Sequence, residues 1–193
     1  MSCNSPLPST EGWSRRQWLA CGAALLAIRA TPHSLATHSR APLVMQGTTL
    51  WPRGEGQLRW LGLSIYTARL WAAEGFDPAQ HAAHPLALEL TYARTFSARD
   101  IAHRSLQEMK RQTLINQATE AIWIQNLATV LPDVKPGDRL LGFHRPAQGA
   151  LFQSGERTLG SVDDPTFSAL FFGIWLSPAT SEPALRATLL APH

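Results

Sequence analysis

The chain has 193 residues, room for one domain or two small ones, and its 45% of hydrophobic and 16% of charged residues argue against disordered and fibrous classes. The first 36 residues hold three arginines and one glutamate, and without them the 14 remaining basic and 13 remaining acidic residues leave a net charge of +1. So small a charge gives little reason to expect nucleic acid or an anionic membrane as the partner.

The N-terminal segment has the pattern of an export signal. It contains SRRQWL at residues 14–19, which resembles the twin-arginine export motif. The apolar stretch at residues 18–28 has 11 residues, whereas a bilayer span needs roughly 20. Small residues at Ser34 and Ala36 suit a cleavage site. We therefore expect residues 1–36 to be a cleaved twin-arginine signal peptide, and residues 37–193 to be a single periplasmic domain without a transmembrane anchor. An amphipathic helix is the alternative, but this segment has no repeating polar face.

Several kinds of site are absent from the sequence. Both cysteines, Cys3 and Cys21, lie in the expected signal peptide, so the mature chain has no disulfide, thiolate ligand or cysteine nucleophile. Lipid attachment at Cys21 is a weaker alternative, because Cys21 opens the apolar region instead of closing it. There is no glycine-rich phosphate loop and no G-x-S-x-G elbow. We expect no cofactor.

The mature chain alternates between strand-like and helix-like segments. Residues 43–45 and 86–92 read as strands, and residues 58–71 read as one long strand with a bulge at Gly62. A loop at 73–85 separates them. Ser97 is a candidate cap of a first helix, a second helix has an apolar face formed by Trp123, Leu127, Val130 and Leu131, and Pro132 ends it. The remaining segments are three short strands at 139–144, 150–153 and 157–162, a helix that begins after Asp164, and a last helix at 181–190. This order predicts an α+β fold, an antiparallel sheet with helices packed on one face.

Few side chains in this pattern suggest chemistry. His81 and His84 have the spacing of a weak metal pair, but they lie in a loop without acidic neighbours and are better interpreted as solvated histidines. The aspartates at residues 163–164 resemble paired carboxylates, although helix capping explains them. His103 and His144 are isolated, which favours surface or hydrogen-bonded structural roles. We expect no metal site.

Several motifs, in the same order, resemble the bacterial chalcone isomerase-like family. They are GQLRWLGLSIYTARLW at residues 56–71, LELTY at 88–92, EMKR at 108–111, GDRL at 137–140, DPTF at 164–167 and FFGIWL at 171–176. The resemblance covers about residues 44–190. It implies an open-faced β-sandwich, in which a large antiparallel sheet carries helices on one face and a cleft lies between them.

The resemblance also implies two ligand-binding residues. The family's cleft arginine, which holds a substrate oxyanion or a fatty-acid carboxylate, matches Arg59, and Tyr66 falls where fatty-acid-binding members have a tyrosine. A guanidinium can grip a carboxylate through two parallel hydrogen bonds. The alternatives are a structural Arg59 paired with an acidic residue at the sheet edge, and a core Tyr66 with its hydroxyl satisfied. Arg69 and Arg94 are reserve candidates.

Three functions compete at this point. The first is a non-catalytic binding module for a small apolar acid such as a fatty acid. The second is an isomerase, an intramolecular lyase that acts on a chalcone-like substrate. The enzymes' helix tyrosine and asparagine have no clear counterpart here, and their late threonine would fall near residues 173–174, which are Gly and Ile. The third is a structural or interaction protein whose cleft is filled by the aromatic side chains of residues 167–175. The sequence indicates no particular protein partner.

Overall fold

The computed structural model describes residues 41–191, so the expected signal peptide at 1–36 lies outside the described residues. Within these described residues a seven-stranded antiparallel sheet forms the framework, and each strand pairs with its neighbours in sequence. This confirms the antiparallel sheet that the sequence predicts. The strands are β1 (Leu43–Met45), β2 (Thr48–Trp60), β3 (Leu63–Ala72), β4 (Leu86–Tyr92), β5 (Arg139–Arg145), β6 (Gly149–Ser154) and β7 (Arg157–Val162).

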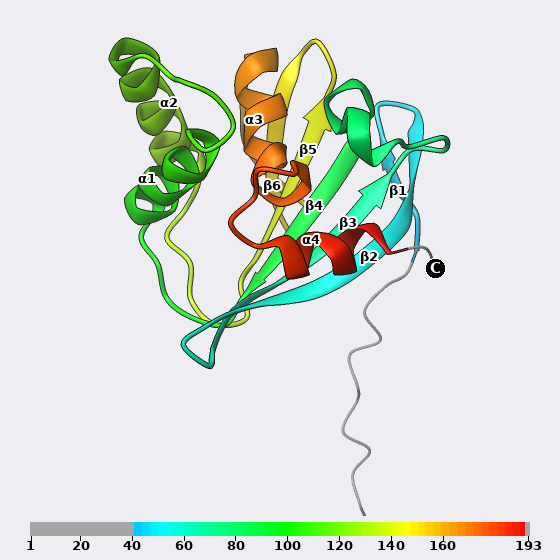
Figure 1. The fold of residues 1–193 in the computed structure, drawn as a ribbon, viewed down its shortest axis with the longest axis horizontal. Helices are drawn as coiled ribbons and strands as arrows, with labels where there is room; N and C mark the ends of the chain where they lie inside the picture. The colour runs from blue at the N-terminus through cyan, green and yellow to red at the C-terminus, as the bar shows by residue number, and fades with distance from the viewer. Residues whose placement is uncertain (1–40, 192–193) are drawn as a thin grey trace, which may run out of the picture. The chain divides into compact units, whose positions relative to one another are not determined.

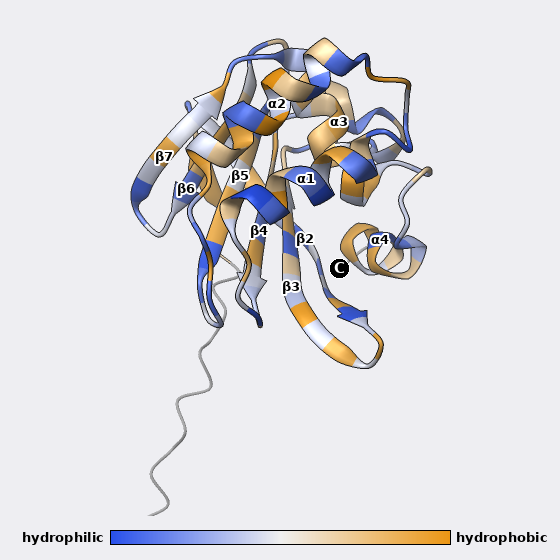
Figure 2. Cartoon of the chain, turned by 90° about the vertical axis from the view of Figure 1, so that its left-hand side faces the viewer, coloured by the Kyte–Doolittle hydropathy of each residue, from blue (hydrophilic) through white to orange (hydrophobic). Residues whose placement is uncertain are grey.

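The prediction of one long strand over residues 58–71 is wrong. The chain reverses at Leu61 and Gly62, and Trp60 at the end of β2 pairs with Leu63 at the start of β3. Both turn residues have positive φ, 48° for Leu61 and 79° for Gly62, as a two-residue type I′ hairpin turn requires. The turn is hard to see in the sequence because apolar residues continue through it, and Gly62 marks a turn rather than a bulge. Figure 2 shows the β2–β3 hairpin projecting from the rest of the domain.

Helices follow the strands where the sequence places them. Ser97 caps α1 by accepting a hydrogen bond from the backbone amide of Asp100, and Asp164 caps α3 by accepting from the amides of Thr166 and Phe167. Residues 78–83 form a short 3₁₀ helix inside the expected loop, and the last helix begins two residues later than expected. The helices are η1 (Pro78–Ala83), α1 (Ala98–Met109), α2 (Gln117–Val130), α3 (Pro165–Leu176) and α4 (Pro183–Leu190).

The helices cover one face of the sheet, as Figure 1 shows. The main core lies between the sheet and this helical layer, and a smaller cluster that includes Trp71 and Phe143 lies on the other face near β1. Helix α4 packs directly on β2, because Gly54 lets the helix backbone approach: a Cβ there would collide with the carbonyl oxygens of Thr188 and Leu189. Within residues 41–191, no helix has the length and apolarity that a membrane span needs.

Candidate functional site

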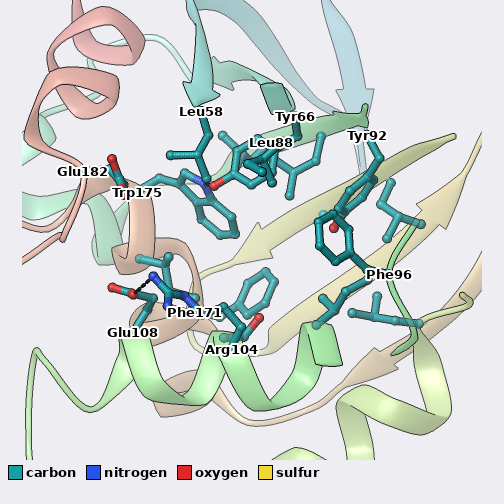
Figure 3. A pocket seen from close by; sticks show the side chains of 18 of the residues that line it. Leu58, Tyr66, Leu88, Tyr92, Phe96, Arg104, Glu108, Phe171, Trp175 and Glu182 are labelled. Atoms are coloured by element: carbon teal, nitrogen blue, oxygen red, sulfur yellow. Dashed lines mark hydrogen bonds and ion pairs between the residues drawn. The ribbon is translucent and has the colours of Figure 1, made fainter. Parts of the chain in front are cut away.

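A cavity of about 430 Å³ lies between the sheet and the helical layer. Its walls come from β2 to β6, α1 and α3, and they are mostly apolar (Figure 3). The apolar side chains that line it include Leu58, Leu88, Leu140, Phe152, Phe171 and Ile174. A cleft filled by the protein's own aromatic residues would leave no such space. Helix α3 does supply Phe171 and Trp175, but they form one wall and do not fill the cavity.

Two tyrosines bring hydroxyl groups to the cavity. Tyr66 on β3 and Tyr92 on β4 meet edge to face, with ring centroids 6.1 Å apart. The Tyr66 hydroxyl accepts a hydrogen bond of 3.0 Å from the indole Nε1 of Trp175, so its own proton is free to be donated. Burial raises the pKa of both phenols above their usual value. Both therefore present neutral hydroxyl groups near neutral pH.

An arginine and a glutamate from α1 form the most polar part of the lining. Arg104 Nη2 lies 2.7 Å from Glu108 Oε1, one helical turn away. The Glu108 side chain is only 10% exposed, whereas the Arg104 side chain is 66% exposed. Arg104 therefore stands at the mouth of the cavity, between solvent and the buried carboxylate. Arg111 approaches the other Glu108 oxygen at 3.7 Å.

The structure places the two expected ligand-binding residues differently. Tyr66 lines the cavity. Arg59 does not: it is exposed on the β2–β3 hairpin, and its Nη2 donates a hydrogen bond of 3.2 Å to the carbonyl oxygen of Gly62. Of the reserve candidates, Arg69 pairs with two glutamates of neighbouring strands, and Arg94 is exposed. Neither lines the cavity.

Arg104 is a site residue that the sequence interpretation passed over. Its spacing does not single it out on the helix expected after Ser97, and a charged residue on such a helix is interpreted as solvated. That reading is correct for most of its surface, but the side chain also borders the cavity. The sequence analysis does not single out Tyr92, Glu108 or Trp175 as site residues either. They occur in the family motifs LELTY, EMKR and FFGIWL, but a motif match does not show where a side chain points.

The other polar candidates have structural roles. His144 is buried, with Nδ1 2.6 Å from the Ser168 hydroxyl and Nε2 3.0 Å from the carbonyl oxygen of Ala82. Burial lowers the pKa of His144 and of the half-buried His81. Among residues 41–191 no group of three histidine, cysteine, aspartate or glutamate side chains could hold a metal ion.

The aspartates at residues 163–164 also have structural partners. Asp164 caps α3 and accepts a hydrogen bond of 2.9 Å from the indole of Trp123. Asp163 pairs with Arg145 at 3.0 Å. Helix capping, which the sequence analysis favoured for both residues, holds for Asp164, whereas Asp163 forms an ion pair instead.

Comparisons with known proteins identify the family. The family model described as chalcone isomerase-like matches residues 37–191. The chain belongs to the chalcone isomerase-like family. An uncharacterized protein of Haemophilus influenzae is 27% identical over 139 residues, which are 72% of this chain and 67% of that protein. The crystal structure of the Arabidopsis thaliana fatty-acid binding protein AtFAP1 aligns with a TM-score of 0.57 and 9% identity, over 78% of this chain and 96% of that one. This likeness confirms the fold expected from the sequence motifs.

Within this chalcone isomerase-like fold, the charged groups that line the cavity are mostly acidic. Among residues 41–191 they are Asp100, Glu108 and Glu182, against one guanidinium, that of Arg104. Asp100 accepts a hydrogen bond of 2.6 Å from the Ser97 hydroxyl at the start of α1. The lining can therefore hold an apolar chain along its inner wall. Within the described part of the chain, it offers an anionic group one cationic anchor, Arg104 at the mouth.

Proposed function

We propose that this member of the chalcone isomerase-like family is an exported binding module that holds an apolar acid, such as a fatty acid. The observation that carries the proposal is the cavity itself, whose mostly apolar wall has the Arg104 guanidinium at its mouth. Its volume of about 430 Å³ falls within the range of roughly 300–1,000 Å³ typical of small-molecule sites. Burial of an acyl chain there supplies the main driving force.

Arg104 is the anchor that this geometry favours for the acid group. Its Nη2 is engaged by Glu108, and no other hydrogen bond or ion pair joins the Arg104 side chain to the residues that the structure describes. Its remaining N–H groups can therefore donate to a ligand carboxylate at the mouth. The neutral Tyr66 and Tyr92 hydroxyls, deeper in the cavity, suit a weakly polar group or a water molecule better than a charge.

Two further observations support the proposal. The similar Arabidopsis fold belongs to a fatty-acid binding protein, which supports a ligand of this class for the cavity. The twin-arginine pattern at residues 14–19 suits export of a folded protein with its ligand already bound.

In the exported form the chain would start near residue 37. The N-terminus of the protein recovered from the periplasm, measured by intact mass, tests this; a chain that keeps residues 1–36 would contradict cleavage.

Palmitate binding tests the proposal and separates its two candidate anchors. We expect wild-type protein to bind palmitate and Arg104→Gln to bind it more weakly, because the guanidinium that meets the carboxylate is gone. Arg59→Gln is the matched control, since it removes the same charge from a residue outside the cavity lining. Weaker binding by Arg59→Gln, with Arg104→Gln unchanged, would restore Arg59 as the anchor. No saturable palmitate binding by wild type, together with no bound lipid on protein purified from its own cells, would contradict the proposal.

A further inference from the structure

The end of the β2–β3 hairpin exposes a compact group of large apolar side chains. We call residues 60–63 the hairpin tip. Trp60, Leu61 and Leu63 are 64%, 79% and 48% exposed, so three of the exposed large hydrophobic residues of the domain fall within four consecutive positions. Figure 2 shows apolar residues at the projecting end of this hairpin. Single exposed leucines need no explanation, but a cluster at the end of a projecting element is a candidate contact surface.

The backbone conformation of the hairpin tip also indicates a functional role for this cluster. Leu61 occupies the first position of the turn with φ of 48°, a conformation that glycine, asparagine and aspartate adopt readily and leucine does not. An asparagine there would satisfy the turn at lower conformational cost. The chain instead keeps a large apolar side chain that contributes nothing to the core. Local strain of this kind is typical of functional positions.

Two arginines are fixed beside the hairpin tip. Arg59 donates a hydrogen bond to the carbonyl oxygen of Gly62, and Arg94 donates one of 3.2 Å to the carbonyl oxygen of Ser64. Both side chains are exposed, and residues 57–66 include no acidic residue. Aromatic and leucine side chains flanked by guanidinium groups suit the boundary between phospholipid headgroups and acyl chains. The arginines can meet lipid phosphates while the apolar side chains enter the acyl layer.

The hairpin tip also adjoins the cavity. Trp60 is both exposed and part of the cavity lining, and Ile65, two residues beyond the hairpin tip, lines the cavity as well. The apolar surface is therefore continuous from the hairpin tip to the inner wall. An acyl chain could pass between a bilayer and the cavity with little exposure to water.

We propose that the hairpin tip inserts into the surface of a phospholipid bilayer, and that the cavity exchanges its apolar ligand with the bilayer at this point. The ligand exchange rests on the proposed function, whereas the insertion does not. With a net charge of +1 expected for residues 37–193, long-range attraction is weak, so insertion of apolar side chains supplies most of the affinity.

Fluorescence quenching by brominated lipids tests the insertion. The protein, purified in the form that accumulates in its own cells, is mixed with vesicles of phosphatidylethanolamine and phosphatidylglycerol that carry bromine on their acyl chains. The Trp60→Phe variant is measured beside it. Because every other tryptophan is common to both proteins, the difference in their quenched signals reports Trp60 alone. We expect the wild type to lose more fluorescence than Trp60→Phe; equal losses would overturn the proposal.

Vesicle flotation with a second pair of variants measures the contribution of Leu61. Leu61→Asn removes the apolar side chain and suits the turn, so a loss of binding cannot be attributed to a damaged hairpin. Leu114→Asn makes the same substitution at a fully exposed leucine between α1 and α2. We expect vesicle binding to fall roughly tenfold or more in Leu61→Asn, the effect of losing one buried leucine side chain, and to be unchanged in Leu114→Asn. Equal effects of the two substitutions would contradict a specific role of the hairpin tip.

Ligand binding in solution separates this proposal from the proposed function. Leu61 does not line the cavity, so Leu61→Asn should bind palmitate as the wild type does and take it up from vesicles more slowly. Quenching at Trp60 in a protein that binds no palmitate would support insertion of the hairpin tip and contradict the proposed fatty-acid ligand. A different set of results would overturn the proposal: a wild-type dimer, a monomeric Leu61→Asn variant and no quenching of either by vesicles. The hairpin tip would then bind a second copy of the chain.

Discussion

Replacing Glu108 with glutamine should tighten the binding of a fatty acid, whereas replacing Arg104 with glutamine should weaken it. The two side chains form one ion pair, with 2.7 Å between Arg104 Nη2 and Glu108 Oε1. A ligand carboxylate on the free edge of the same guanidinium would therefore compete with the Glu108 carboxylate. Glutamine keeps the shape of Glu108 and one oxygen that accepts from Arg104, and it replaces the other oxygen, which Arg111 approaches, with an uncharged amide nitrogen.

The size of the effect follows from the charges. A ligand carboxylate on the opposite edge of the Arg104 guanidinium lies roughly 6 Å from the Glu108 carboxylate. At that distance the repulsion between the two charges is about 0.7 kcal/mol in water and about 2.8 kcal/mol at an effective dielectric constant of 20. Arg104 is 66% exposed, so the mouth is well solvated and the lower part of this range applies. We expect the dissociation constant of palmitate to fall about three- to tenfold in Glu108→Gln.

Titration of palmitate, and of the uncharged alcohol of the same length, into wild type and both variants measures these effects. The alcohol should bind all three proteins nearly equally, because it lacks the charge that both residues act upon. Added salt should reduce the difference for palmitate. If Glu108→Gln weakens palmitate binding as strongly as Arg104→Gln does, the pair acts as a structural unit or Glu108 contacts the ligand, and the acid-anchor reasoning is refuted.

Three further predictions concern stability. Leu61→Asn should raise the free energy of unfolding by about 1 kcal/mol, measured in urea, because it relieves an unfavourable turn conformation. Gly54→Ala should lower it by about 1–3 kcal/mol and loosen α4, because the added methyl group collides with the helix backbone; normal α4 protection in hydrogen exchange would contradict this. Burial lowers the pKa of His144 in the folded state, so stability should fall as the pH drops below about 6.5, and His144→Gln should reduce that slope in melting temperature against pH.

Much of the fold could be predicted from local sequence. The caps at Ser97 and Asp164 and the three strands that end the sheet depend on a few adjacent residues, and the structure has each of them. The β2–β3 hairpin was misread because its turn has one ordinary signal, Gly62, next to a leucine that does not favour the conformation. Here the pairing of two strands across the sheet outweighs the local preference of one residue.

The cavity and its charged residues were decided by tertiary structure. The family motif predicts both Tyr66 and Arg59 as ligand-binding residues. Tyr66 does line the cavity, whereas Arg59 is exposed on the β2–β3 hairpin and lies outside the lining. Which arginine borders the cavity depends on how α1 is rotated against the sheet. That rotation results from the packing of many distant side chains, so no spacing within α1 reveals it. By itself the sequence determined the layers of this protein, because caps and alternation are local; the space between those layers depends on contacts between residues far apart in the chain.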